Sequence, residues 1–356
     1  MTPSNLEFPD MHKLDRRQFL LTGASAVAAS TLPLPLLAAD LPEVTIAIIG
    51  DGRSGPWAAA QANITGYDFA KAVGANIRWQ PGFTASLPVM EAIRSGDVDF
   101  TFATSTALVN AIDVGIPIIP VAAFPLPVNT VDGLARADSG IRNATDLRGR
   151  RVGYQRGTTG HFSLLKYLEQ AGVGFDEIEG VSLSGSEGFT ALSQGEIDAW
   201  FHWQPAATIG LARLGDAVVK LENVPTYDYA FYVAREGFYE KHPEVAVRLA
   251  VAVREVQRRI NADPAGTVAL WAANGGFEAG SIEARAFEQL LAEKRTSEST
   301  AVDLHPADER AARATQVLAD SFHEHGVLPR KVDVAAFLLD PRFDDLRNTL
   351  ASALEA

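Results

Sequence analysis

Two short clusters of hydroxyl side chains each stand just after an apolar run, where a helix is expected to begin. One cluster is Thr104-Ser105-Thr106, and the other is Thr158-Thr159 with His161 close behind. Free backbone N–H groups and hydroxyls at a helix N-terminus bind anions such as sulfonate, phosphate or carboxylate. A threonine that only caps its helix leaves the same pattern, so the second cluster alone leaves both interpretations open. A similar cluster in each half of the chain favours one anion site built by both halves.

A glycine-rich segment, Gly50-Asp-Gly52-Arg-Ser-Gly55, has the GxGxxG spacing of a dinucleotide-binding fingerprint. That fingerprint also needs an acidic residue at the end of the next strand, where this chain has Arg78-Trp79-Gln80-Pro81. We therefore predict a flexible loop at the edge of a cleft, in which Arg53 contacts an anion; a solvated arginine is the alternative. Trp203, directly before a predicted helix, is expected to form a wall for the ligand, with packing in the core as the alternative.

Composition excludes several classes of function. The 356 residues carry 31 basic and 44 acidic side chains, a formal net charge of −13, and no cysteine. Nucleic acid is excluded as a partner, because its binding depends on clustered Lys and Arg. Disulfides, thiolate zinc sites and Cys nucleophiles are excluded as well. His323 and His325 are two residues apart, a spacing that cannot chelate a metal on a helix, and no GxSxG or Walker A motif occurs. We predict no enzyme, no cofactor and no metal site.

The elements that position these residues follow an α/β pattern. Short apolar runs alternate with segments of helical length. These runs are 44–49, 76–79, 98–102, 117–121, 151–154, 197–201 and 217–221. Residues 92–99 are similar to residues 191–198, and each octapeptide joins a helix end, a glycine turn and a new strand, which indicates two lobes of similar construction. After Tyr239 the pattern is mostly helical.

The N-terminal segment 1–39 is interpreted as an export signal. Arg16-Arg17-Gln18-Phe19-Leu20 precedes a mildly apolar run, an arrangement that resembles a bacterial twin-arginine signal. Two prolines, Pro33 and Pro35, make this run a poor transmembrane helix. A membrane anchor and an unstructured N-terminus are the alternatives. We expect cleavage near Ala39 and a mature chain in the periplasm.

Strings spread over the mature chain carry a family resemblance. They are Ser95-Gly-Asp-Val-Asp99, Asp146-Leu-Arg-Gly-Arg-Arg-Val-Gly153, His161-Phe-Ser-Leu-Leu165, Gly195-Glu-Ile-Asp-Ala199, Trp203-Gln-Pro205 and Glu240-Lys-His-Pro-Glu244. With them the chain resembles the periplasmic substrate-binding proteins of ABC importers for taurine and other alkanesulfonates. The resemblance implies an α/β, type II periplasmic binding protein fold, in which two α/β lobes are joined by two hinge strands near 125–135 and 222–232. Lobe I takes 40–128 and the mostly helical 227–356, and lobe II takes 129–226.

The resemblance also implies a function. The chain is expected to be a periplasmic solute receptor that binds taurine or a related aliphatic sulfonate in the interlobe cleft. It would deliver this ligand to the permease and ATPase subunits of an ABC importer, with only transient contact with the membrane permease. The implied ligand-binding residues, besides Arg53, are Ser105, Thr106, Thr158, Thr159 and His161 for the sulfonate, Trp203 for the cleft wall and Asp228 for the ammonium group of taurine. A receptor for another small organic anion or for a thiamine-pyrimidine precursor stays open, as does an exported cofactor-binding enzyme.

Overall fold

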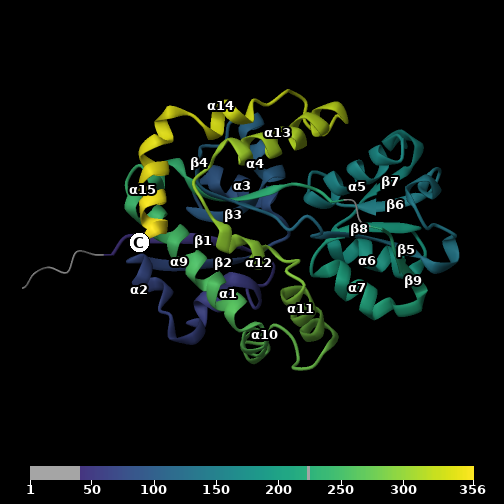
Figure 1. Ribbon diagram of the computed structural model, residues 1–356, viewed down its shortest axis with the longest axis horizontal. Coiled ribbons are helices and arrows are strands. Elements are labelled where there is room, and N and C mark those ends of the chain that lie inside the picture. The colour runs from purple at the N-terminus through teal and green to yellow at the C-terminus, as the bar shows by residue number, and fades with distance from the viewer. Residues whose placement is uncertain (1–40, 223–224) are drawn as a thin grey trace, which may run out of the picture. The chain divides into compact units, whose positions relative to one another are not determined.

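Two five-stranded sheets, each covered by helices, make up the unit Leu41–Ala356 (Figure 1). The computed structural model describes residues 41–222 and 225–356. The predicted export signal at 1–39 lies outside the described residues. In the described part of the chain, no helix combines the length and the apolar character needed to cross a bilayer.

The first sheet has the strand order β2-β1-β3-β10-β4. Its strands are β1 (Glu43–Ile49), β2 (Asn76–Phe83), β3 (Phe100–Thr104), β4 (Ile118–Pro125) and β10 (Tyr229–Arg235). Strand β1 is parallel to β2 and β3, whereas β10 runs antiparallel to β3 and β4. Residues 44–48 of β1 are all buried, because helices cover both faces of this sheet.

The second sheet repeats this plan in the order β7-β6-β8-β5-β9. Its strands are β5 (Val131–Arg136), β6 (Arg151–Tyr154), β7 (Glu179–Ser182), β8 (Ala199–Trp203) and β9 (Val218–Lys220). Strand β6 is parallel to β7 and β8, whereas β5 runs antiparallel to β8 and β9. In each sheet, the antiparallel strand is the one that the chain enters directly after crossing from the other sheet.

The chain crosses between the sheets at 126–130, from β4 to β5, and returns at 221–228, from β9 to β10. These crossings overlap the segments predicted to form the hinges. The predicted arrangement of two α/β lobes joined by two connections is therefore what the structure has. From here, the first lobe is the first sheet with its helices, and the second lobe is the second sheet with α5, α6 and α7.

Helices surround both sheets (Figure 1). Those of the first lobe are α1 (Gly55–Gln61), α2 (Phe69–Val73), α3 (Ser86–Ser95), α4 (Ser105–Val114), α8 (Glu236–Tyr239), α9 (Pro243–Ala262), α10 (Pro264–Ala273), α11 (Ile282–Ala292), α12 (Ser297–Thr300), α13 (Glu309–Glu324), α14 (Val334–Leu338) and α15 (Asp344–Glu355). Those of the second lobe are α5 (Thr159–Gln170), α6 (Gly185–Gln194) and α7 (Ala206–Leu214). Single turns of 3-10 helix lie at Ile64–Gly66, Ala137–Ser139, Ala144–Leu147, Phe175–Glu177, Gly215–Ala217, Ala301–Asp303 and Pro341–Phe343.

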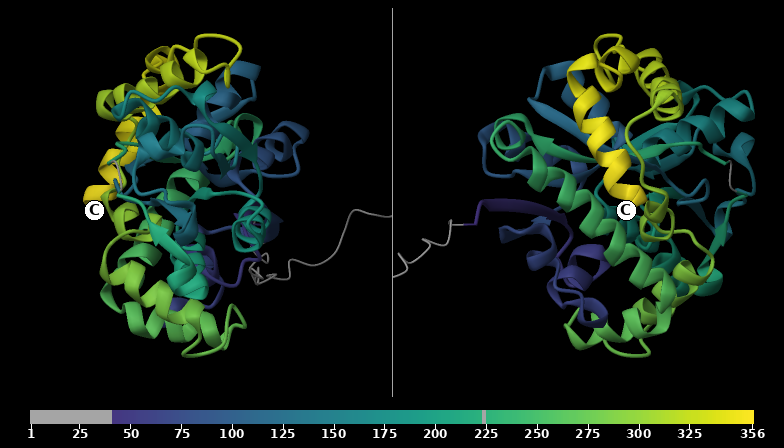
Figure 2. Two further views of the ribbon diagram at one scale, coloured as in Figure 1. Left: turned by 90° about the vertical axis from the view of Figure 1, so that its right-hand side faces the viewer. Right: turned by 60° about the vertical axis from the view of Figure 1, so that its left-hand side comes forward.

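The long helix α9 packs the C-terminal third against the first sheet. Its predicted apolar face is fully buried: Val245, Leu249, Ala252, Val256 and Ile260 are each at most 2% exposed. Helix α15 lies beside α9, as Figure 2 shows. The C-terminal segment thus completes the first lobe and forms no third domain.

The internal repeat has the same structure in both lobes. Gly96 and Gly195 end α3 and α6 with φ of 87° and 75°, a left-handed conformation that favours glycine. The aspartates that follow, Asp99 and Asp198, each accept a backbone N–H from a neighbouring strand at 3.0 Å. Each copy therefore anchors the start of a new strand to the strand beside it.

Candidate ligand-binding site between the lobes

A cavity of about 630 Å³ lies between the two lobes. Both lobes supply hydroxyl groups to its wall: Ser54, Thr84, Ser86, Thr101, Thr104, Thr106, Thr130, Thr158, Thr159, Ser184, Ser186, Thr296 and Ser297. Its apolar lining includes Ile48, Ile49, Trp57, Phe83, Leu87, Phe102, Leu126, Trp203 and Phe287. Among the described residues that line the cavity, none is Asp, Glu, Lys or Arg. From the described lining, a ligand here meets hydroxyls, amides, backbone groups and rings.

Four helices of ten or more residues, α3, α4, α5 and α6, begin at this cavity. Their lining residues from the first turn are Ser86, Leu87, Thr106, Thr159 and the pair Gly185 and Ser186. The first turn of a helix has N–H groups without partners inside the helix and carries partial positive charge. Four such ends around one cavity favour an anionic ligand.

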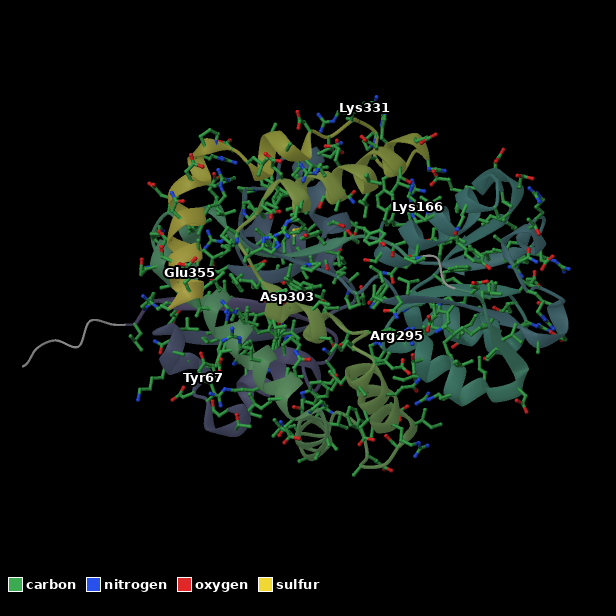
Figure 3. The ribbon with its side chains drawn as sticks, in the orientation of Figure 1. Tyr67, Lys166, Arg295, Asp303, Lys331 and Glu355 are labelled. Atoms are coloured by element: carbon green, nitrogen blue, oxygen red, sulfur yellow. The ribbon has the colours of Figure 1, made fainter. Side chains whose placement is uncertain are left out.

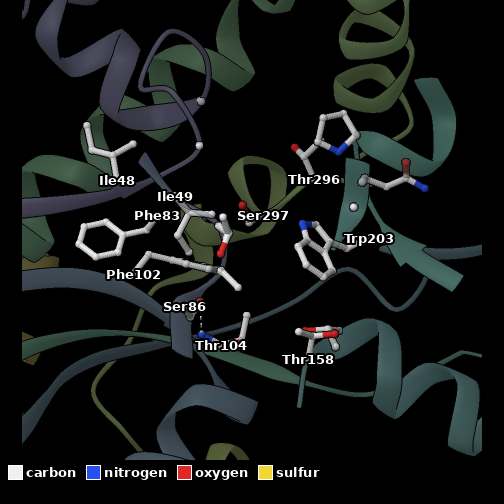
Figure 4. Close-up of a pocket in the computed structure, with 18 of the residues that line it drawn as sticks. Ile48, Ile49, Phe83, Ser86, Phe102, Thr104, Thr158, Trp203, Thr296 and Ser297 are labelled. Carbon is white, nitrogen blue, oxygen red and sulfur yellow. Dashed lines mark hydrogen bonds between the residues drawn. The ribbon is translucent and has the colours of Figure 1, made fainter. Parts of the chain in front are cut away.

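The N-terminus of α5 has the clearest polar geometry. Thr158 caps the helix: its hydroxyl accepts the N–H of His161 at 3.4 Å and donates to the carbonyl oxygen of Gln155 at 2.7 Å. Thr158 and Thr159 both line the cavity, and Figure 4 shows Thr158 on the same side as Trp203. The single proton of this hydroxyl is donated to Gln155, so Thr158 can donate to a ligand only by turning that proton into the cavity, while it still accepts the N–H of His161.

His161 points away from the cavity, although it belongs to the same helix end. Its ring packs against Tyr154, Phe175 and Phe322, with ring centroids 4.5, 5.5 and 5.4 Å away. Its Nδ1 accepts the N–H of Gly157 at 3.3 Å. Burial lowers the pKa of His161 to about 3, so the ring is neutral at pH 7. In this structure His161 supplies packing and not positive charge.

Ser105 and Asp228 also lie outside the described lining, and they bind each other instead. Ser105 is fully buried, and its hydroxyl donates to Oδ1 of Asp228. The same oxygen accepts the N–H of Tyr229 at 2.7 Å, while Oδ2 accepts no hydrogen bond from the part of the chain described. Burial raises the pKa of Asp228 to about 6, against the hydrogen bonds from Ser105 and Tyr229. The carboxyl group predicted to meet a ligand ammonium thus lies beside the start of α4, behind the cavity wall.

Comparison with known proteins identifies the family. The model for the family described as NMT1/THI5 like matches residues 69–266, which is more than half of the chain. The chain belongs to the NMT1/THI5-like family.

Two relatives are named as binding proteins for sulfonates or taurine. The chain is 25% identical to a putative aliphatic sulfonates-binding protein of Escherichia coli (strain K12) over 259 residues, which cover 73% of this chain and 78% of the relative. It is 29% identical to the taurine-binding periplasmic protein of the same organism over 236 residues, 65% of this chain and 71% of the relative.

Solved structures confirm the predicted fold. The alkanesulfonate-binding protein SsuA from Xanthomonas axonopodis pv. citri, bound to MOPS, superposes with a TM-score of 0.71 at 21% identity, covering 84% of this chain and 98% of SsuA. The periplasmic aliphatic sulphonate binding protein SsuA from Escherichia coli gives 0.68 at 23% identity, covering 84% and 99%. This NMT1/THI5-like chain therefore has the fold of a periplasmic binding protein.

The glycine-rich loop reaches the cavity, but Arg53 does not line it. Ser54 and Gly55 belong to the wall, whereas the exposed Arg53 donates from Nη1 to the carbonyl oxygen of Gly275 at 3.3 Å. The loop is thus at the cavity edge, while its arginine holds the turn after α10.

Sequence reasoning missed several lining residues of this NMT1/THI5-like chain. Ser86 and Ser297 begin helices, a signal that the hydroxyl rule used for the two predicted clusters would have found. Tyr232 lies within a strand and Gln257 within a helix. These two positions carry no local signal, because only the packing of α9 on the first sheet brings them to the cavity.

A buried ion pair holds the segment before α12 against the second lobe. Nη2 of Arg295 donates to both carboxylate oxygens of Asp132 in β5, each at 2.7 Å, and the two side chains are 8% and 2% exposed. Asp132 also pairs with Lys220 at 2.9 Å and accepts from Gln204 at 2.8 Å. Figure 3 labels Arg295 beside the second lobe. The pair positions Gln204 and Thr296, both of which line the cavity.

The structure offers no metal site in its described part, since no group of three or more His, Asp or Glu side chains could hold an ion there. The cavity wall offers a ligand hydrogen bonds from hydroxyl groups, helix N-termini and apolar contact.

Proposed function

We propose that this chain is a periplasmic solute receptor that binds taurine or a related aliphatic sulfonate between its lobes and delivers it to the permease of an ABC importer. The observation that carries the proposal is the convergence of four helix N-termini and many hydroxyls on a cavity in whose described lining no side chain is charged. A sulfonate spreads one negative charge over three oxygens, which suits several weak donors. The names of the two Escherichia coli relatives support the same ligand class.

The lining favours a sulfonate with an uncharged tail over taurine. An ammonium group inside this cavity would lose its water and meet no carboxylate, because the described lining includes none. Asp228, the one acid predicted for that role, is buried against Ser105. Taurine is therefore expected to bind more weakly than ethanesulfonate.

The remaining parts of the proposal concern the whole chain. Residues 1–39 are proposed as a twin-arginine export signal, and 40–128 with 227–356, and 129–226, as the two lobes. Hinge motion of the lobes around 126–130 and 221–228 would close them on the ligand and exclude water. The closed form is the state expected to dock on the permease. We propose a receptor and not an enzyme, which agrees with the binding roles named for its relatives.

Isothermal titration of the chain from Asp40 onward tests the ligand class. Ethanesulfonate, taurine, nitrate and a thiamine pyrimidine are the probes. Tight binding of ethanesulfonate, weaker binding of taurine and none of the pyrimidine is the expected order. Tighter binding of taurine than of ethanesulfonate would show that the site has a partner for the ammonium group. Binding of the pyrimidine alone would overturn the sulfonate assignment.

A substitution at the start of α5 tests the geometry. Thr158→Ala removes a hydroxyl at the cavity wall and is expected to weaken ethanesulfonate binding by about 3- to 10-fold, because this hydroxyl must exchange its bond to Gln155 for one to the anion. Thr158→Ser keeps the hydroxyl and serves as the matched control. Thr158→Ala also removes a helix cap worth about 1 kcal/mol, so thermal melting must show that the variant is folded. Equal affinity of both variants would contradict a role for this hydroxyl.

A further inference from the structure

One buried side chain at the apolar end of the cavity has an unused hydrogen-bond acceptor. Gln257 of α9 is 1% exposed and lines the cavity together with Tyr232 of β10. Its Nε2 donates to the hydroxyl oxygen of Tyr232 at 2.7 Å. Its Oε1 accepts no hydrogen bond from any residue that the structure describes. A buried amide oxygen without a donor is costly, so this position needs an explanation.

Aromatic and aliphatic side chains surround the pair. The ring of Tyr232 lies 6.0 Å from Trp57 and 6.4 Å from Phe102, both of which line the cavity. Figure 4 shows Phe102 with Ile48 on one side of the cavity and Trp203 with Thr158 on the other. The rings around Tyr232 therefore form an apolar end of the cavity on the first lobe, with Gln257 beside them, while helix N-termini of both lobes supply the polar wall.

The helix itself does not require a polar residue at this position. The neighbours of Gln257 on the helix, Val256 and Ile260, are both fully buried in the core. A methionine or leucine would satisfy the packing of such a face without leaving an unpaired oxygen. Gln257 is therefore a specific polar feature in an apolar setting.

The cost of burying a charge indicates which kind of ligand group can donate to Gln257. An ammonium group would have to leave water for one neutral oxygen, and a single such contact does not offset its loss of hydration. A hydroxyl or an amide N–H needs only one acceptor, and its transfer into an apolar site costs far less. The expected donor is therefore uncharged.

We propose that Oε1 of Gln257 accepts a hydrogen bond from an uncharged donor, a hydroxyl or an amide N–H, at the tail of the bound sulfonate. This inference rests on the proposed function for the sulfonate end of the ligand. The preferred substrate is then a two-ended molecule, with a sulfonate at one end, an apolar middle and a neutral polar tip.

Titration with matched ligands tests this proposal. The probes are n-alkanesulfonates from ethane to octane, each compared with the sulfonate of the same length that carries a terminal hydroxyl or a terminal methoxy group. At the chain length that spans the cavity, the hydroxyl is expected to tighten binding about 3- to 10-fold, which is the range of one net hydrogen bond. The methoxy group cannot donate and is expected to give no gain.

Gln257→Met assigns the effect to this residue. The variant is expected to lose the difference in affinity between the hydroxyl ligand and the plain alkanesulfonate of the same length, whatever its affinity for the plain one, whereas Gln194→Met, at an exposed position of α6, keeps this difference. Retained binding of plain alkanesulfonates also shows that the variant is folded. The inference is overturned if Gln257→Met still prefers the hydroxyl ligand, or if the unmodified chain shows no such preference at any ligand length. Neither result contradicts the proposed function. Failure of every sulfonate to bind the unmodified chain overturns the proposed function, and the inference with it.

Discussion

Replacing Asp228 by Asn is expected to make the protein more stable at neutral pH and to have little effect in acid. The carboxyl group is buried, and only one of its oxygens is hydrogen bonded to described residues. Burial raises its pKa from 3.8 to about 6. The folded protein therefore keeps a proton on Asp228 that the unfolded chain releases between about pH 4 and pH 6.

The size of the effect follows from this difference in pKa. At 1.36 kcal/mol per pKa unit, a rise from 3.8 to about 6 corresponds to a penalty of about 3 kcal/mol in the free energy of unfolding once the pH exceeds 6. Below the unfolded pKa both states hold the proton, and the penalty vanishes. Asp228→Asn cannot ionise, so its stability relative to the parent chain should rise by about 3 kcal/mol from pH 4 to pH 7.

Urea unfolding of both chains at half-unit pH steps between 4 and 8 measures this difference. Comparison with the parent chain cancels the titration of the other groups. Asp216→Asn, at an exposed position, controls for the loss of one carboxylate charge. A difference between Asp228→Asn and the parent that stays constant or falls as the pH rises would refute the reasoning.

The same variant separates two roles for this carboxyl group. If Asp228 only adds negative charge near the start of α4, Asn should tighten ethanesulfonate binding at pH 7 by about 2- to 5-fold, because that charge opposes an anion at the helix end. If Asp228 binds a ligand ammonium, Asn should weaken taurine binding and leave ethanesulfonate unchanged. Paired titrations of the two ligands decide between these results.

Two further substitutions test the contacts that hold the cavity together. Arg295→Met removes the bidentate partner of the buried Asp132, which also pairs with Lys220, and is expected to cost about 3 kcal/mol in urea unfolding. A cost below about 1 kcal/mol would contradict the importance of this pair. Gly188→Ala would place a Cβ 2.2 Å from Nε1 of the buried Trp200. We expect it to cost about 1–3 kcal/mol, measured by thermal denaturation, although alanine is otherwise the better helix former; stabilisation would show that the ring can move aside.

The architecture was predictable because the patterns that encode it are local. The helix expected at 86–95 is α3, and the strand expected at 151–154 is β6. The strand expected at 98–102 begins two residues later, at Phe100. Before it, the side chain of Asp99 accepts the backbone N–H of Thr45 in the neighbouring strand β1. Hydrophobic periodicity and glycine turns therefore located the elements, and contacts between strands set their ends.

The candidate site was predictable only in part, for a geometric reason. Thr106, Thr158 and Thr159 line the cavity, whereas Ser105 and His161, from the same two helix ends, are buried elsewhere. Successive side chains on a helix point about 100° apart, so neighbours in sequence face different surroundings. A cluster of polar residues thus locates a helix end, but it does not show which of them reaches the ligand.

By itself the sequence determined the α/β class, the repeated lobe, the exclusion of thiol chemistry and the presence of hydroxyl-rich helix ends, since each depends on residues close together in the chain. Only the tertiary structure decided what surrounds residues whose contacts are far away in the sequence. Ser105 binds Asp228, 123 positions away, and the carboxyl group held by this contact does not line the cavity. Gln257 reaches the cavity because α9 packs on the first sheet. Burial and charge balance at such points depend on which distant segments meet, and no local pattern encodes that.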